Sequence, residues 1–227
     1  MENLAQADPP ARKAARAEPA SLRERAYRTI RDKIITCELR PGEAVSEGAL
    51  SAALGIGRTP VHQALDRLMV EGLVDVLPRK GVVVRPLSLD EVVDIIDVRL
   101  VNETWCARLV AERATADEIA ALEDNLARFG RAVEDRDLVR LMRLDEAFHL
   151  ALSGAARNPV LADLLRTLHS RSLRFWFVSL RAADHYRRVA REHAAIVATI
   201  RDRDPAAAET AMRAHIDAFR ANLVRHL

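Results

Sequence analysis

The chain has 227 residues, of which 49% are hydrophobic and 30% are charged, and its formal net charge is +2. No apolar run reaches the roughly 18 residues that a transmembrane helix needs, and the first residues lack the apolar core of a secretory signal. Composition therefore predicts a soluble globular protein without a membrane partner. Cys37 and Cys106 fit no disulfide framework, so we expect a reducing, cytoplasmic location.

The first 86 residues predict three helices and a hairpin behind a disordered tail. Capping residues, glycine turns and β-rich runs mark the boundaries. In chain order, the expected elements are a tail at 1–20, a helix that begins with the Ser21–Glu24 capping box, helices at about 47–54 and 59–71, and a hairpin of residues 73–77 and 82–84 around the basic turn Pro78-Arg79-Lys80-Gly81. This order is typical of a winged helix-turn-helix domain, which we place at residues 21–86.

Residues 87–227 carry no strand signal and predict an all-α domain. Helix start signals such as Ser88 with Glu91, and Thr115 with Glu118, divide this part of the chain. The expected helices are at about 89–113, 116–134, 138–156, 159–181, 185–203 and 205–226. Because the loops are short, neighbouring helices should pack antiparallel. The fold class is therefore mainly α, with a six-helix antiparallel bundle after the winged helix.

The third N-terminal helix is expected to lie in the major groove of DNA. Arg58 at its start can bond guanine bidentately, and Thr59 offers a hydroxyl to a phosphate. His62 lies one turn further on. Arg79 and Lys80 at the hairpin tip are candidates for contacts to the DNA backbone or to a neighbouring groove. The alternatives are a solvated surface arginine, a surface histidine and an ordinary charged turn.

Polar side chains interrupt the apolar faces of three bundle helices. Asp145 and His149 are four residues apart on one helix, while His193 and His215 each stand within an apolar stripe of a later helix. A buried carboxylate is costly unless it is paired or binds a metal. The four groups suit zinc or another divalent transition metal, and no thiolate joins them. The alternative is a buried Asp–His hydrogen-bonded network.

Arg99 and Glu103 share the inner face of the first bundle helix, four residues apart. One interpretation is an ordinary ion pair between neighbouring turns. The other is that Arg99 holds the carboxylate of a small organic acid, the effector, over the metal. His169 and Trp176 on the fourth bundle helix are candidates to shape this effector pocket with Glu103, and ordinary packing is the alternative for both.

The N-terminal pattern resembles the DNA-binding domain of GntR-type regulators over about residues 22–85. The matching residues are Ser46-Glu47, Leu50, Leu54-Gly55-Ile56-Gly57-Arg58-Thr59-Pro60-Val61, Ala64-Leu65, Leu68, Glu71-Gly72-Leu73-Val74 and Arg79-Lys80-Gly81. Gly48 and His62 depart from the pattern, since members often carry basic residues at these positions. The resemblance thus implies DNA contact by Arg58, with an operator that differs from the commonest one or with weaker binding.

The rest of the chain resembles the FadR-type (FCD) ligand-binding domain. Many FCD regulators bind a metal through an Asp-x-x-x-His pair and one His on each of two later helices, a pattern that Asp145, His149, His193 and His215 match. The resemblance implies zinc first, with nickel or manganese as alternatives. Family members also often carry an arginine at the position of Arg99, which favours its role in binding the effector.

These features together predict a ligand-responsive transcriptional repressor and not an enzyme. We expect a homodimer on a pseudo-palindromic double-stranded operator, with a small carboxylate as effector. A pure metal-ion sensor is the first alternative. A metal-dependent hydrolase or lyase is the second, and it leaves the winged helix unexplained and has no nucleophile motif or phosphate-binding glycine loop.

Overall fold

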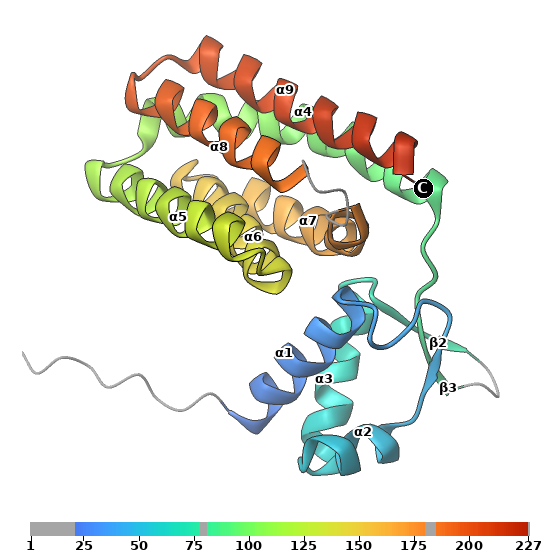
Figure 1. The fold of residues 1–227 in the computed structure, drawn as a ribbon. Helices are drawn as coiled ribbons and strands as arrows, with labels where there is room; N and C mark the ends of the chain where they lie inside the picture. Colours follow the sequence, from blue (N-terminus) through green and yellow to red (C-terminus); the bar gives the residue numbers. More distant parts are fainter. Residues whose placement is uncertain (1–20, 78–80, 180–184, 227) are drawn as a thin grey trace, which may run out of the picture.

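The computed structural model describes residues 21–77, 81–179 and 185–226 and consists of two parts (Figure 1). The N-terminal module contains α1 (Leu22–Ile35), β1 (Ala44–Val45), α2 (Glu47–Leu54), α3 (Arg58–Val70), β2 (Val74–Leu77) and β3 (Gly81–Val84). The helical bundle contains α4 (Leu89–Arg113), α5 (Ala116–Asp135), α6 (Leu138–Ala155), α7 (Pro159–Ser179), α8 (His185–Arg201) and α9 (Pro205–His226). The predicted fold class is confirmed, and most helix ends differ from the prediction by no more than two residues.

The N-terminal module packs α1 and α3 around a small apolar core that includes Ile30, Ile34 and Leu68. Its sheet has the order β1-β3-β2, and both pairings are antiparallel. The β2–β3 hairpin is the predicted wing. The sequence did not indicate β1, because a strand of two residues has no period and forms only where β3 offers it a free edge.

Helix-capping residues explain why the helix boundaries could be predicted from the sequence. Thr115 and Glu118 form a complete capping box, in which each side chain accepts from the other residue's backbone N–H. At α1 the box is only half formed. Ser21 accepts from the N–H of Glu24, but the Glu24 carboxylate binds Arg28 and Arg67 instead.

The long helix α4 organises the bundle. It packs most extensively on α9, and it also contacts α6, α7 and α8. The pairs Arg108–Glu209 and Asp97–Arg220 link α4 and α9 in antiparallel register. Large buried side chains such as Phe129 and Phe148 fill the interior. Consequently, α4, α6, α7, α8 and α9 all direct side chains into one central region.

Helix α1 belongs to both parts of the molecule. Its Ile30 and Ile34 lie in the N-terminal core, whereas Ile35 packs into the bundle core. The segment between β3 and α4 is held as well, because Arg174 of α7 donates to the backbone carbonyl of Arg85. None of the described helices combines the length and apolar character needed to cross a bilayer.

Candidate functional site

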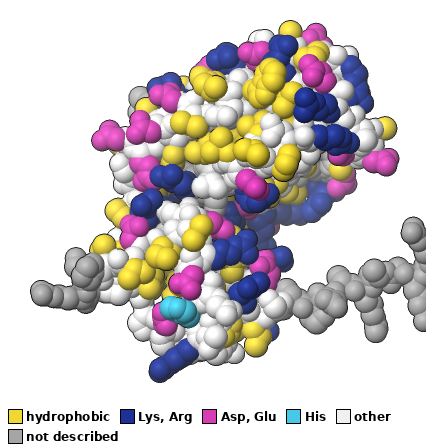
Figure 2. Space-filling view, turned by 180° about the vertical axis from the view of Figure 1, so that it is seen from behind, with side chains coloured by type: hydrophobic (Ala, Val, Ile, Leu, Met, Phe, Trp, Pro, Cys, Tyr) yellow, Lys and Arg dark blue, Asp and Glu magenta, His cyan; other side chains and the backbone are white. Residues whose placement is uncertain are grey.

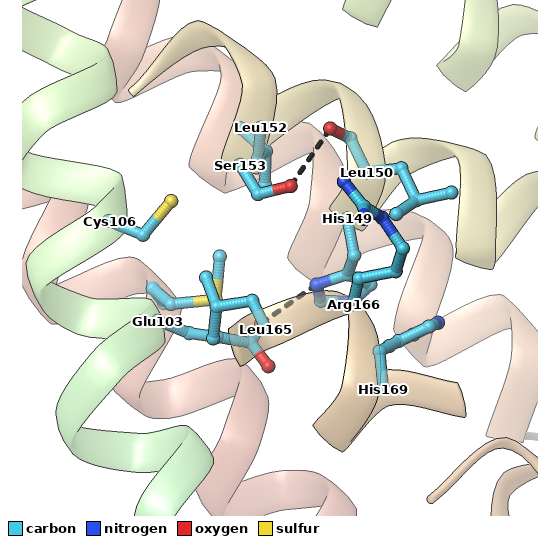
Figure 3. Close-up of a pocket in the computed structure, with 10 residues that line it drawn as sticks. Glu103, Cys106, His149, Leu150, Leu152, Ser153, Leu165, Arg166 and His169 are labelled. Carbon is cyan, nitrogen blue, oxygen red and sulfur yellow. Dashed lines mark hydrogen bonds and ion pairs between the residues drawn. The ribbon is translucent and has the colours of Figure 1, made fainter. Parts of the chain in front are cut away.

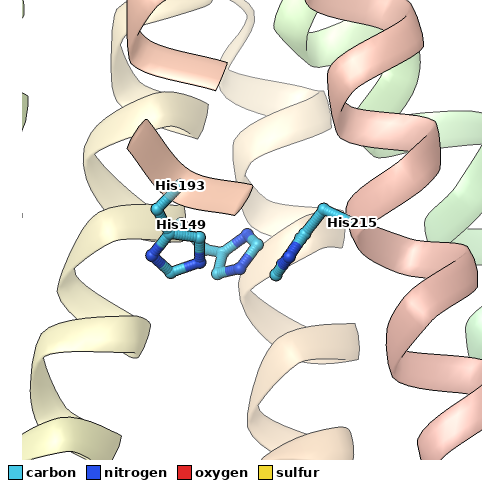
Figure 4. A group of neighbouring side chains, drawn as sticks. All are labelled: His149, His193 and His215. Carbon is cyan, nitrogen blue, oxygen red and sulfur yellow. The ribbon is translucent and has the colours of Figure 1, made fainter. Parts of the chain in front are cut away.

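Five buried polar side chains meet in the centre of the bundle. Asp145 and His149 come from α6, His169 from α7, His193 from α8 and His215 from α9, and each is at most 8% exposed. Figure 4 shows the rings of His149, His193 and His215 turned toward one another. One nitrogen of each of these three rings lies within 4.8 Å of the other two. The structure thus places side by side the histidines that the sequence singled out.

Asp145 lies against two of the imidazoles without reaching hydrogen-bond geometry. Its Oδ1 is 3.5 Å from His193 Nε2, and its Oδ2 is 3.7 Å from His169 Nε2. Burial raises the pKa of Asp145 well above its usual range. Burial also lowers the pKa values of His193 and His169 well below theirs. Burial therefore disfavours both the negative charge on Asp145 and a positive charge on either histidine, unless a neighbouring group of opposite charge compensates.

Several polar atoms in this centre have no hydrogen-bond partner. They are Asp145 Oδ1 and both ring nitrogens of His193 and of His169. Leaving a buried donor or acceptor unpaired costs about 1–3 kcal/mol per group. The Asp–His hydrogen-bonded network that the sequence left open is therefore not formed among these residues. A divalent cation would accept the carboxylate oxygen and one nitrogen of each ring, which is the chemistry of this donor set.

Two glutamates orient the outer nitrogens of the cluster. Glu103 Oε2 is 2.8 Å from His149 Nδ1, and Glu192 Oε2 is 2.9 Å from His215 Nδ1. Because a carboxylate accepts, each Nδ1 carries the proton, and each Nε2 keeps its lone pair for the centre. Glu192 was missed by the sequence analysis. No local pattern marked it, because it becomes a partner of His215 only through the packing of α9 against α8.

Arg99 and Glu103 form the ion pair that was one of the two sequence-based interpretations. Arg99 Nε is 2.5 Å from Glu103 Oε1, and Arg99 Nη1 donates to Ser172 Oγ at 3.0 Å. Both residues are buried. Burial alone would raise the pKa of Glu103, but Arg99 and His149 outweigh it and hold this pKa well below the usual range. Glu103 is therefore a charged bridge between an arginine and a histidine.

The predicted effector residues line two small cavities on either side of His149, and each has room for about one water molecule. Glu103 and His169 line the first together with Cys106, Ser153 and Leu165, as Figure 3 shows. Arg99 and Trp176 line the second together with His185, Glu192 and His215. His185, at the start of α8, had no signal in the sequence beyond its residue type.

The candidate DNA-binding residues Arg58 and Thr59 are exposed in the first turn of α3. Gly57 caps this helix without a side-chain hydrogen bond, so first-turn N–H groups remain available to an anion. His62 is also exposed, but its Nδ1 lies 2.8 Å from Glu47 Oε1 and its Nε2 lies 3.5 Å from Asp66 Oδ2. The hydrogen bond to Glu47 and the charge of Asp66 raise the pKa of His62.

The remaining candidates for DNA contact, Arg79 and Lys80, lie outside the described residues, as does the predicted tail at 1–20. The structure therefore bears only on the α3 part of the expected DNA-binding surface. On that part, two acidic side chains surround His62 and oppose the approach of a phosphate.

Comparison with known proteins assigns both parts of the chain. The family model for bacterial regulatory proteins of the gntR family matches residues 22–84, and the FCD domain model matches residues 94–218. Among curated relatives, the Nta operon transcriptional regulator of Aminobacter aminovorans is 36% identical over 143 residues, which cover 63% of this chain and 66% of that protein. The HTH-type transcriptional repressor RspR of Escherichia coli K12 is 28% identical over 195 residues, 86% of each chain.

A solved structure supports the fold independently. McbR/YncC of E. coli superposes with a TM-score of 0.81 at 20% sequence identity, covering 91% of this chain and 99% of that one. The order and packing of the helices are thus shared although few residues are. At this level of identity the superposition supports the fold, and it does not bear on the individual side chains of the bundle centre.

Replacing Arg99 with methionine should lower the free energy of unfolding by about 3–5 kcal/mol, because Glu103 would keep a buried charge without its main partner. Urea denaturation followed by circular dichroism measures this. The double variant Arg99→Met/Glu103→Gln should recover most of the loss, because the amide carries no charge and its oxygen can still accept from His149 Nδ1. A single variant as stable as the parent would show that the pair does not hold the bundle together.

Proposed function

Because the chain belongs to the GntR family of bacterial regulatory proteins and carries an FCD domain, we propose that it is a metal-containing transcriptional repressor controlled by a small organic acid. Family and relatives are transcriptional regulators rather than enzymes. The observation that carries the metal and effector part is the set of unpaired buried atoms of Asp145, His169 and His193 beside His149 and His215.

The proposed metal ligands are Asp145, His149, His193 and His215. Three neutral imidazoles and one carboxylate form a set that zinc accepts, and the absence of a thiolate from the cluster disfavours softer ions. When bound, the ion supplies a positive charge that attracts an anionic oxygen. Glu103 and Glu192 hold two of the ligand rings in place through their Nδ1 atoms. His169 lies beside Asp145 and is the fifth buried polar side chain of the centre.

The proposed effector is a small carboxylate bound between Arg99 and the metal ligands. Arg99, Trp176 and His215 line one cavity, and the charged guanidinium can bind a carboxylate bidentately. The cavity is nearly closed, so a ligand must move its walls in order to enter. A ligand that fits only a rearranged bundle has different affinities for two states, which is the requirement for an allosteric effector.

DNA binding is assigned to residues 21–86, with α3 in the major groove. Arg58 and Thr59 lie at the exposed end of α3 that recognition helices present to the bases. Two copies of the chain would present two such helices to a pseudo-palindromic operator. The contacts of His62 with Glu47 and Asp66 support the expectation that this operator differs from the commonest one of the family.

The proposed dimer surface is the outer face of α4. Val98, Val101 and Trp105 are 43%, 69% and 52% exposed at helical spacing. Figure 2 shows apolar side chains gathered in a band across the bundle, with acidic and basic groups around it. A two-fold pairing with a second copy would bury this stripe against itself, because such an interface uses the same surface patch on both copies.

The metal proposal predicts that the purified protein binds one zinc ion per chain, and that His193→Ala abolishes this binding. Glu192→Gln keeps every ligand but leaves His215 Nδ1 only a neutral, weaker acceptor in place of a carboxylate, so its zinc affinity should fall about 10–100-fold. Elemental analysis and a competition titration measure both effects. Glu112→Gln, on the exposed end of α4, is the control. Equal zinc content in His193→Ala and the parent would exclude this site.

The DNA-binding proposal predicts that Arg58→Ala weakens specific operator binding by about 1–3 kcal/mol. The reason is the loss of a base contact at the start of α3, so nonspecific affinity should change much less. Fluorescence anisotropy at matched salt, with specific and scrambled duplexes, separates the two terms. Arg23→Ala, at the exposed start of α1, serves as the control for a general loss of charge. An unchanged specific affinity would remove Arg58 from the interface.

The dimer proposal predicts that Trp105→Glu yields a folded monomer, because a charge would replace the largest apolar contact of the stripe. Analytical ultracentrifugation at micromolar concentration gives the oligomeric state. Val160→Glu, at a 78% exposed position on α7, should remain dimeric. If Trp105→Glu sediments as the parent does, the dimer uses another face.

A further inference from the structure

Arg31 is a buried charged residue at the contact between the two parts of the molecule. It lies on α1 and is only 8% exposed. Its guanidinium binds Glu146 of α6 through both terminal nitrogens, with Nη1 3.1 Å from Oε2, and Nη2 also donates to Ser170 Oγ of α7 at 3.3 Å. A single side chain thus bonds two bundle helices at once.

The same guanidinium faces the end of the recognition helix. Arg31 Nε lies 3.9 Å from Glu71 Oε2, and Glu71 is the C-cap residue of α3. Glu71 in turn accepts from Tyr27 Oη at 2.8 Å and from Arg67 Nε at 3.1 Å. Since Tyr27 lies on α1 and Arg67 on α3, Glu71 ties the orientation of α3 to α1 directly beside Arg31.

Each bundle partner of Arg31 follows directly after a residue of the polar centre. Glu146 follows Asp145, and Ser170 follows His169. Successive side chains on a helix point about 100° apart, so one residue faces the bundle centre while the next faces α1. Asp145 and His169 are also among the residues with unpaired atoms that a ligand would engage. A shift of either residue toward a ligand therefore moves a bonding partner of Arg31, because close-packed helices transmit displacement.

A second carboxylate, that of Glu71, lies close enough to Arg31 to become its hydrogen-bond partner after a small shift. Its Nε is buried and has no hydrogen-bond partner, while Glu71 lies 3.9 Å away, beyond hydrogen-bond range. An unpaired N–H on a buried cation is unfavourable, so a small shift toward Glu71 would satisfy it. Two arrangements that differ in which carboxylate is fully bonded form a two-state element of the kind that allosteric coupling needs.

We infer that Arg31 is the positioning residue that couples the bundle centre to α3, by exchanging hydrogen bonds between Glu146 and Glu71. The inference rests on the proposed metal and effector site and adds the route by which that site reaches the DNA-binding helix. A second ion pair, Asp32–Arg143, joins the same two helices, but its side chains are 31% and 61% exposed. Water screens that pair, so it should carry little of the coupling.

Hydrogen–deuterium exchange of the full chain, with and without one equivalent of zinc chloride, tests this. In the parent, zinc should slow exchange in α6, α8 and α9 and also change exchange in α1 and α3. Arg31→Gln should keep the zinc effect in the bundle and lose it in α1 and α3. Glu146→Gln changes the same pair from the bundle side, because an isosteric neutral amide cannot accept through two charged oxygens, and it should behave alike. Arg143→Gln is the control and should respond as the parent does.

The outcomes separate the two claims. If zinc leaves the parent bundle unchanged, the proposed metal site is wrong. If the bundle responds but α1 and α3 do not, or if both still respond in Arg31→Gln and Glu146→Gln, the coupling role of Arg31 is wrong while the metal site stands. Loss of the response in Arg143→Gln to the same degree would equally overturn it, because any interface contact would then suffice.

Discussion

The structure depends on the burial of polar groups where five helices meet. Asp145 and His193 are almost completely buried, so each of their polar atoms needs a partner within the protein or from a ligand. Glu103 and Glu192 accept from the outer nitrogens of His149 and His215, whereas Asp145 Oδ1 and the ring nitrogens of His169 and His193 have no hydrogen-bond partner among the described residues. A bundle selected for stability alone would gain from apolar residues here. The polar side chains that occupy this position instead are the basis of the proposed metal site.

The charges around this centre are arranged in an ordered series. Arg99 holds Glu103 ionised, Glu103 orients His149, and His149 turns its free nitrogen inward. On the other side Arg188 lies 3.1 Å from Glu192, which orients His215. His149 and His215 are thus each oriented by a carboxylate that lies beside an arginine. Such preorganisation lowers the cost of binding a cation, since the ligand rings need not be ordered when it arrives.

The contact between the two parts is mostly polar, in contrast to the apolar cores within each part. Ile35 contributes apolar contact, and the polar links among the described residues include Arg31–Glu146, Asp32–Arg143 and Arg174 to the carbonyl of Arg85. Polar interfaces of this kind rearrange more readily than packed cores. In the proposed mechanism, this distribution lets the DNA-binding helices keep their own fold while their orientation changes.

The sequence by itself determined the elements, because capping residues, glycine turns and apolar periods act over a few residues. The limits of α4 at Leu89–Arg113 and the inward face of His193 and His215 followed from such local signals. Only tertiary structure decided the role of Glu192, the formation of β1 and the position of Arg31 between Glu146 and Glu71. Each depends on partners far away in the chain, and no local pattern specifies which helix faces which neighbour.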